Sequence, residues 1–110
     1  MSYYLFEIED SQGIRVRLCK RRWERHIKKK RPWMSRYLSL IKQAIAFPQV
    51  ITTDKDWDDC LDYYIYGVGK RKDLYLMVVV QYYTAKDGSR RGWVRTAFLT
   101  AEVSRKGDLI

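Results

Sequence analysis

The chain has 110 residues, 46% of them apolar, and its 22 Lys and Arg against 13 Asp and Glu give a formal net charge of +9. This length suits one domain over residues 1–110, and no apolar run reaches the ~18 residues of a membrane helix, so we expect no membrane partner. The first ten residues, MSYYLFEIED, lack the basic start and apolar stretch of a secretory signal, so we expect a cytoplasmic protein.

Cysteine and histidine are scarce, which limits the cofactor chemistry of the chain. Cys19 and Cys60 stand outside any metal-ligand spacing, and the single histidine, His26, argues against a zinc site. The sequence also lacks a P-loop, a GxGxxG fingerprint, an HExxH motif and a nucleophile elbow. We therefore expect reduced thiols and no metal or other cofactor.

The first predicted elements are two strands, residues 3–8 and 14–18, that form a hairpin. In residues 14–18, apolar side chains alternate with arginines at the period of a half-buried strand. Gly13, in the link between the two runs, supports a turn at that point.

Two helices are predicted next, over residues 20–30 and 33–47. Trp23 and Ile27 are four residues apart and so share one face of the first helix, while Lys and Arg fill most of the remaining circumference. The second helix carries an apolar stripe at helical spacing, which we interpret as core, and Pro48 ends it.

Strands dominate the rest of the chain. Runs of β-branched, aromatic and apolar residues predict strands at 49–53, 61–69, 74–83 and 92–103, and the tail, 104–110, is expected to fray. Consecutive strands with short links pair antiparallel, and helices grouped before strands indicate the α+β class. The predicted fold is an N-terminal hairpin, two helices, then an antiparallel sheet of about four strands, with the helices packed on one face and the other face free for a ligand.

Basic residues crowd both ends of the chain, and an acidic segment, residues 54–62, lies between them. A basic excess favours polyanionic partners through phosphate contacts and counterion release, so we predict RNA as a partner. The acidic segment lacks the spacing of a calcium loop, and we interpret it as a solvated loop or as an acidic counterweight to the basic helix. The cations expected to contact RNA are Arg22, Arg25, Lys28, Lys29, Lys30, Lys70, Arg71, Lys72 and Arg91.

Several motifs follow one another in order between residues 15 and 100: WERHI at 23–27, Pro32, LIKQAIAFPQVI at 40–51, LYLMVVV at 74–80 and RTAF at 95–98. In order and spacing they resemble the phage-associated branch of the barnase–EndoU–colicin–RelE-like (BECR) nuclease superfamily. The resemblance implies a metal-independent endoribonuclease with helices followed by an antiparallel sheet. Such enzymes bend RNA so that its own 2′-oxygen attacks the adjacent phosphate, and they supply a base, an acid and cations around the phosphorane.

Carried across this resemblance, His26 falls on the family's helix histidine. Arg31 stands where the family has the histidine of a His-Pro-Glu motif, and Trp33 replaces its acidic residue. Because arginine keeps its proton, His26 would be the sole conventional titrating group near neutral pH. Thr96 matches the closing-strand motif, with Arg95 just before it, and strand alternation would put these two on opposite faces. The candidate catalytic residues are therefore His26, Arg31, Arg95 and Thr96.

Three functions stay open at this point. The first is an endoribonuclease or toxin-like RNase domain. The second is a catalytically inactive RNA-binding module, because the family's histidine is missing at Arg31. The third is a protein-interaction domain whose basic face binds an acidic partner, such as an antitoxin or immunity-type protein. The nuclease hypothesis requires that His26, Arg31 and either Arg95 or Thr96 meet in one basic cleft; otherwise a histidine beside an apolar helix face is a structural residue.

Overall fold

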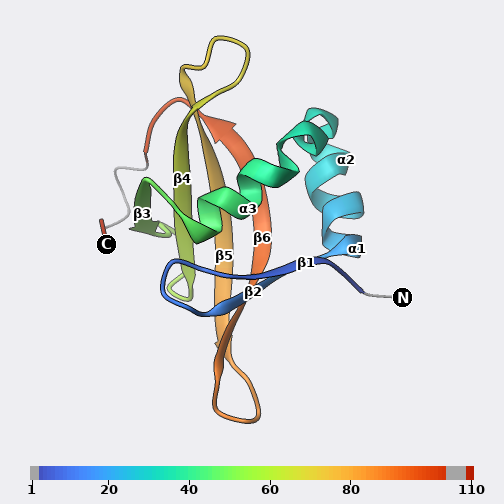
Figure 1. Cartoon of the computed structure of the whole chain (residues 1–110), viewed down its shortest axis with the longest axis vertical. Helices are drawn as coiled ribbons and strands as arrows, with labels where there is room; N and C mark the ends of the chain where they lie inside the picture. Colours follow the sequence, from blue (N-terminus) through green and yellow to red (C-terminus); the bar gives the residue numbers. More distant parts are fainter. Residues whose placement is uncertain (1–2, 104–108) are drawn as a thin grey trace.

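Within residues 3–103 and 109–110, which the computed structural model describes, six strands form one mixed sheet in the order β1-β2-β6-β5-β4-β3 (Figure 1). All neighbouring strands pair antiparallel except β2 and β6, which run parallel. The strands are β1 (Tyr4–Glu9), β2 (Arg15–Cys19), β3 (Val50–Thr53), β4 (Cys60–Val68), β5 (Leu74–Thr84) and β6 (Arg90–Thr100).

The predicted antiparallel sheet of about four strands is wrong, because the N-terminal hairpin joins the same sheet and gives it six strands in the described part of the chain. In the parallel pairing of β2 with β6, Arg15 lies opposite Arg91 and Arg17 lies opposite Trp93. Val16, fully buried, packs in the same core as the central strands. Burial of Val16 and cover for the open edge of β6 both favour this pairing. The α+β class itself is confirmed.

The helical segments lie between β2 and β3, and the first three of them form one continuous helix over residues 20–30. Arg31 then leaves the helical region, at φ −138° and ψ 78°, as expected of a residue before proline. Among the described residues no helix is long and apolar enough to cross a membrane. The segments are α1 (Lys20–Arg22), the π-helical turn η1 (Trp23–Ile27), α2 (Lys28–Lys30), the 3-10 segment η2 (Pro32–Tyr37) and α3 (Leu38–Ala46).

The helices bury the main core against one face of the sheet. α3 crosses that face over β4 and β5 (Figure 1), where its Ile41 and Ile45 are fully buried. Trp23 and Ile27 share the buried side of the first helix, as predicted, at 5% and 0% exposure. Each fully buried isoleucine contributes about 1.5–3 kcal/mol relative to an exposed one. The opposite face carries a smaller buried cluster, made by Cys60, Tyr64, Met77 and Val79.

A buried polar network fixes the turn of the N-terminal hairpin to the centre of the sheet. Asp10, 5% exposed, accepts hydrogen bonds at Oδ1 from the backbone N–H groups of Gln12 and Ile14, both at 2.8 Å. At Oδ2 it accepts from the hydroxyls of Tyr82 at 2.7 Å and Tyr63 at 3.4 Å. The two hydroxyls also contact each other. Burial raises the pKa of Tyr63 from the ordinary 10.0 to about 12, so its hydroxyl remains protonated into the alkaline range.

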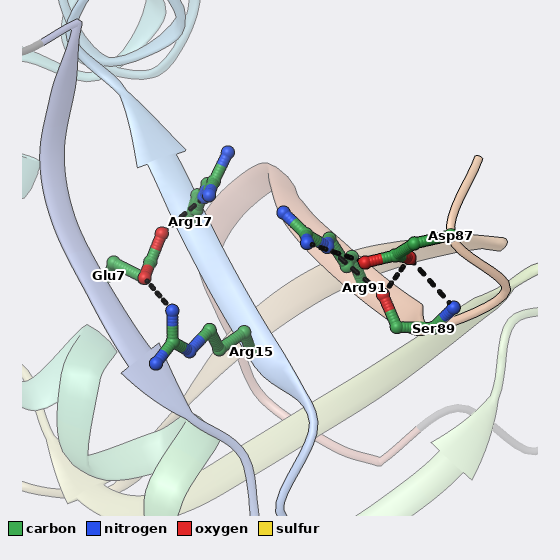
Figure 2. A network of polar contacts seen from close by, with 6 residues as sticks. All are labelled: Glu7, Arg15, Arg17, Asp87, Ser89 and Arg91. Carbon is green, nitrogen blue, oxygen red and sulfur yellow. Dashed lines mark hydrogen bonds and ion pairs between the residues drawn. The ribbon is translucent and has the colours of Figure 1, made fainter. Parts of the chain in front are cut away.

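Figure 2 shows two sets of polar contacts on strands and turns outside this core. Glu7 of β1 pairs with Arg15, at 3.1 Å, and with Arg17 of the neighbouring strand. In the β5–β6 hairpin, Asp87 pairs with Arg91 at 3.4 Å. Surface pairs of this kind contribute about 0–1 kcal/mol each, but they occupy cations that would otherwise be available to a polyanion.

The end of the chain adds to the sheet beside β3. Leu109 forms a β-bridge with Thr52, and the N–H of Ile110 donates to the carbonyl of Ile51 at 3.0 Å. Residues 104–108 of the tail that the sequence predicts to fray lie outside the described residues. The bridge covers part of an edge strand that would otherwise present unpaired backbone groups.

Candidate functional site

A cleft of about 810 Å³ opens on the face of the sheet that α3 leaves uncovered. Its floor is made by alternate residues of the three central strands, and two walls rise from segments that flank the sheet. The first wall is the helix of residues 20–30 together with Arg31, and the second is the loop of residues 54–57 before β4. The floor residues are Asp62, Tyr64, Met77, Val79, Thr96, Phe98 and Thr100.

The structure brings the four candidate catalytic residues into this one cleft. His26 and Arg31 reach it from the helix wall, and Arg95 and Thr96 reach it from β6. The helix of residues 20–30 lies beside the end of β6 that extends past β2 (Figure 1), which explains how segments so distant in sequence meet. The four residues therefore line one cleft, although carboxyl groups share it with the cations.

A β-bulge in β6 lets both Arg95 and Thr96 face the cleft. Val79 of β5 lies opposite Thr96, but the next residue, Val80, lies opposite Val94, so Arg95 is the extra residue in β6. A bulge of this kind re-aims a side chain that regular alternation would send to the other face. The sequence-based expectation that only one of the two would face the cleft is wrong for this reason.

His26 owes its position to its neighbours on the helix. Trp23 and Ile27 anchor the helix in the core, and His26 sits half-buried at the border of that face. In the π-helical turn the N–H of Lys28 bonds to the carbonyl of Trp23, five residues back. Such wide turns rotate the following side chains relative to a regular helix and are frequent at functional sites.

The environment of His26 keeps its imidazole neutral. Burial lowers its pKa below the ordinary 6.5, and the positive charges of Lys30, Arg22, Arg31 and Arg95 lower it further. At pH 7 the ring therefore has one nitrogen with a lone pair that can accept a proton. A neutral histidine among cations is suited to act as a base beside a bound anion.

Two guanidinium groups on the helix wall form cation–π contacts with aromatic rings of β6. The Cζ of Arg22 lies 5.0 Å from the ring centre of Trp93, and the Cζ of Arg31 lies 5.3 Å from that of Phe98. A guanidinium within about 6 Å of an aromatic ring is attracted to its face, and its N–H groups can donate to phosphate oxygens. The two contacts therefore help to position the charges on this wall.

Arg95 is held from two sides. Its Cζ lies 4.1 Å from the ring centre of Trp57, in the loop before β4, and its Nη1 donates to Oε1 of Gln81 at 2.8 Å. Asp54 shapes that loop by accepting at Oδ2 from the N–H groups of Asp56, at 2.9 Å, and Trp57, at 3.1 Å. The guanidinium thus links the bulge in β6 to the loop wall across the floor.

Acidic residues oppose the cations across the cleft, so the cleft is divided rather than uniformly basic. Five Lys or Arg side chains line it, and so do four carboxyl groups. Asp54 and Asp56 belong to the loop wall, Asp62 belongs to the floor, and Glu102 follows β6. An anion is therefore favoured at the helix wall and disfavoured at the loop wall.

Asp62 is a functional candidate that sequence reasoning missed. The sequence assigns residues 54–62 to a loop, but β4 already begins at Cys60, so Asp62 points from a strand into the floor at 1% exposure. Among the described residues its Oδ1 has no hydrogen-bond partner. Burial raises its pKa to about 8, and a side-chain hydrogen bond with Asp54 and the charges of Asp54 and Asp56 add to the shift. The one signal in the sequence is an aspartate directly before the apolar run of β4.

The cations predicted to contact RNA are distributed over several surfaces. Arg22 and Lys30 line the cleft. Lys28 pairs with Glu24 at 3.2 Å on the outside of the helix, where Arg25 and Lys29 are exposed. Lys70, Arg71 and Lys72 are exposed in the β4–β5 turn, while Arg91 pairs with Asp87 in the β5–β6 hairpin, at the other end of the long axis (Figures 1 and 2).

Within residues 3–103 and 109–110, no three or more His, Cys, Asp or Glu side chains are grouped to hold a metal ion. Cys19 and Cys60 are both free thiols. Comparison of the chain with models of known families, with curated proteins and with solved structures found no match.

Proposed function

We propose that this chain is a metal-independent endoribonuclease, of the toxin-like RNase type, that cleaves RNA by attack of a 2′-oxygen on the adjacent phosphate. The observation that carries this proposal is that His26, Arg31, Arg95 and Thr96 line one cleft. A base, fixed cations and a hydroxyl donor are the groups that such a reaction needs around a phosphate. RNA is accordingly the proposed partner, and the cytoplasm is the proposed location.

In this proposal His26 is the base that takes the proton of the 2′-hydroxyl. Its lowered pKa leaves the ring ready to accept a proton at neutral pH. Proton transfer by a positioned side chain contributes about 10²–10⁴-fold to a rate. The imidazolium that forms is stabilised because the phosphorane carries more negative charge than the starting phosphate.

The arginines of the cleft hold the phosphate and neutralise the charge that develops on it. Arg31 and Arg22 approach from the helix wall and Arg95 from the bulge, each held by an aromatic ring within 4.1–5.3 Å. Fixed donors need no reorganisation during the reaction, which makes them effective at stabilising a transition state. Thr96, beside Arg95 on the floor, adds a hydroxyl that can donate to a phosphate oxygen.

The shape of the cleft suits one or two nucleotides of a single strand. Its volume of about 810 Å³ lies within the range of small-ligand sites. The strand's phosphates belong at the helix wall, because the loop wall is acidic. Half-buried Phe98 in the floor gives a base an aromatic surface on which to stack.

A digestion assay tests the proposal. RNA incubated with the purified protein in EDTA should be cut to products with 2′,3′-cyclic phosphate ends. His26→Ala should lower the rate at least tenfold, since a positioned base contributes about 10²–10⁴-fold. Arg31→Ala should slow cleavage strongly, whereas Arg36→Ala, an exposed arginine of η2 outside the cleft, serves as the matched control. RNA left intact by the wild-type protein would contradict the proposal.

A second candidate is an RNA-binding module without catalysis. The observation that favours it is Arg31, which stands in the place of a family histidine and cannot transfer a proton. This candidate predicts binding that weakens steeply with salt, no cleavage, and a shallower salt dependence when Lys28, Lys29 and Lys30 are replaced by alanine. Binding of a small acidic protein that RNA fails to displace would instead indicate a protein partner for the basic helix.

A further inference from the structure

Asp62 lies in the same transverse row of the sheet as the candidate catalytic residue Thr96. Asp62 of β4 is opposite Val79 of β5, and Val79 is opposite Thr96 of β6. All three side chains line the cleft floor. Two strand spacings of about 4.8 Å put Asp62 about 10 Å from Thr96. A phosphodiester seated between the helix wall and the centre of the sheet would therefore have His26 on one side and Asp62 on the other.

The carboxyl group of Asp62 forms a side-chain hydrogen bond with Asp54 of the loop wall, but one of its two oxygens is left over. Buried side-chain oxygens are almost always hydrogen-bonded, yet Asp62 Oδ1 has no partner in the described part of the chain. The residue is only 1% exposed, and its side chain nevertheless contributes to the lining of the cleft. Thr52, directly opposite Asp62 in β3, carries the other buried oxygen without a partner in the described part of the chain, so Asp62 Oδ1 has Thr52 on one side and the cleft on the other.

We propose, on the basis of the proposed function, that Asp62 is the general acid of the reaction and gives its proton to the 5′-oxygen that leaves. This assigns the acid role that Arg31 cannot fill in place of the family's histidine. The site then has two proton-transfer groups, His26 on the helix wall and Asp62 in the floor. No metal ion is needed for either role.

The reaction balances with these two groups. His26 takes the proton of the 2′-hydroxyl while the 2′-oxygen forms its bond to phosphorus. The bond between phosphorus and the 5′-oxygen breaks, and the 5′-oxygen takes the proton of Asp62. The products are a 2′,3′-cyclic phosphate and a free 5′-hydroxyl, with His26 protonated and Asp62 ionised. Exchange with water then restores both groups.

The surroundings of Asp62 keep it protonated at neutral pH. Burial is the main cause, followed by a side-chain hydrogen bond with Asp54 and by the charges of Asp54 and Asp56 in the loop wall. Lys55 in that loop opposes the shift, and the pKa of Asp62 reaches about 8. Tyr64, the titratable residue two positions after Asp62 in β4, also lines the cleft. A carboxylic acid that still holds its proton at pH 7 is suited to donate it to a leaving oxygen.

The surroundings of His26 shift its pKa in the opposite direction. Arg22, Lys30, Arg31 and Arg95 surround the imidazole and, together with burial, keep its pKa below 6.5. Cleavage of RNA should therefore fall on the acid side as His26 gains a proton. It should fall on the alkaline side as Asp62 loses its proton, around pH 8. A pair of groups whose pKa values are pushed apart in this way defines a base and an acid.

The test compares two kinds of substrate. RNA has a poor leaving group that needs a proton, whereas the 3′-(p-nitrophenyl phosphate) esters of the four ribonucleosides have a leaving group that needs none. Asp62→Asn should lower kcat on RNA by about 100-fold or more but cleave the aryl esters at close to the wild-type rate. Asp58→Asn, at an exposed aspartate between the loop wall and β4 that does not line the cleft, should match wild type on both substrates.

The outcomes separate the two proposals. Equal losses of Asp62→Asn on RNA and on the aryl esters, or no loss on RNA, would overturn the acid role and leave the nuclease proposal standing. A wild-type protein that cleaves neither substrate would overturn both. Should Asp62→Asn fold poorly, the wild-type pH profiles decide: an alkaline limb near pH 8 on RNA but not on the aryl esters supports the acid role, and identical profiles contradict it.

Discussion

Tyr82→Phe is the sharpest test of how the fold is held together. The hydroxyl of Tyr82 donates to Asp10 at 2.7 Å and contacts the hydroxyl of Tyr63, all in a buried site. The substitution removes one oxygen and leaves the ring, which is 4% exposed, in place. Its effect therefore reports on the hydrogen bond rather than on packing.

The expected loss of stability depends on the hydrogen bonds that Asp10 retains in the variant. Its carboxyl group accepts hydrogen bonds from two backbone N–H groups and two tyrosine hydroxyls, and the variant retains all but that of Tyr82. Hydrogen bonds to a charged group are worth about 1.5–3 kcal/mol. Because Tyr63, at 3.4 Å, is a weak replacement, we expect a loss of about 2 kcal/mol in the free energy of unfolding.

Equilibrium unfolding in urea measures this loss. With a slope of about 2 kcal/mol per M, the midpoint should fall by about 1 M at an unchanged slope. Tyr83→Phe is the matched control, because Tyr83 is the next residue of the same strand but is 41% exposed. We expect the control to stay within about 0.5 kcal/mol of wild type. Equal effects of the two substitutions would refute the role given to the network.

Three further predictions concern Gly92, Cys60 and Asp62. Gly92→Ala should destabilise the protein by about 1–3 kcal/mol in thermal unfolding, because the new Cβ would lie 3.0 Å from a methyl group of buried Val80 and 3.1 Å from the ring of Tyr82; unchanged stability would contradict this packing. Cys60 is buried, and burial raises its pKa to about 12, so iodoacetamide should leave it unmodified in the folded protein and alkylate it in urea, as peptide mass spectrometry would show. Because folding raises the pKa of Asp62 from 3.8 to about 8, Asp62 stabilises the fold below pH 3.8 and this stabilisation is lost as the pH rises to about 8. Asp62→Asn should therefore gain stability relative to wild type over that interval, and a constant difference would contradict the shift.

The local patterns of the sequence predict most of the secondary structure. The alternation in residues 14–18 predicts the strand β2, which the structure contains. The shared face of Trp23 and Ile27 is buried, as predicted. The continuously apolar run near residue 77 lies in the central strand β5, as predicted. These features depend on the periodicity of neighbouring residues, which a sequence shows directly. The joining of β2 to β6 depends on contacts between distant segments, and no local pattern indicates it.

The site was predictable only in part, for a similar reason. His26 and Arg31 lie where the motifs along the helix place them. The bulge at Arg95 is a property of the pairing between β5 and β6, and regular alternation therefore excludes the arrangement that is observed. The burial of Asp62 was not predicted because a charged side chain is expected at a solvent-exposed position. Asp62 is buried because it lies within the strand β4.

The most direct test of the shared cleft uses the chain's only histidine, whose ring gives a single set of NMR signals. A 2′-O-methyl RNA oligonucleotide can bind without being cleaved. We predict that the ring signals of His26 shift on titration with this RNA, and that the pKa of His26, below 6.5 in the free protein, rises in the complex because a phosphate lies beside it. Ring signals that stay unmoved at saturating RNA, or a pKa that is the same with and without RNA, would contradict the account.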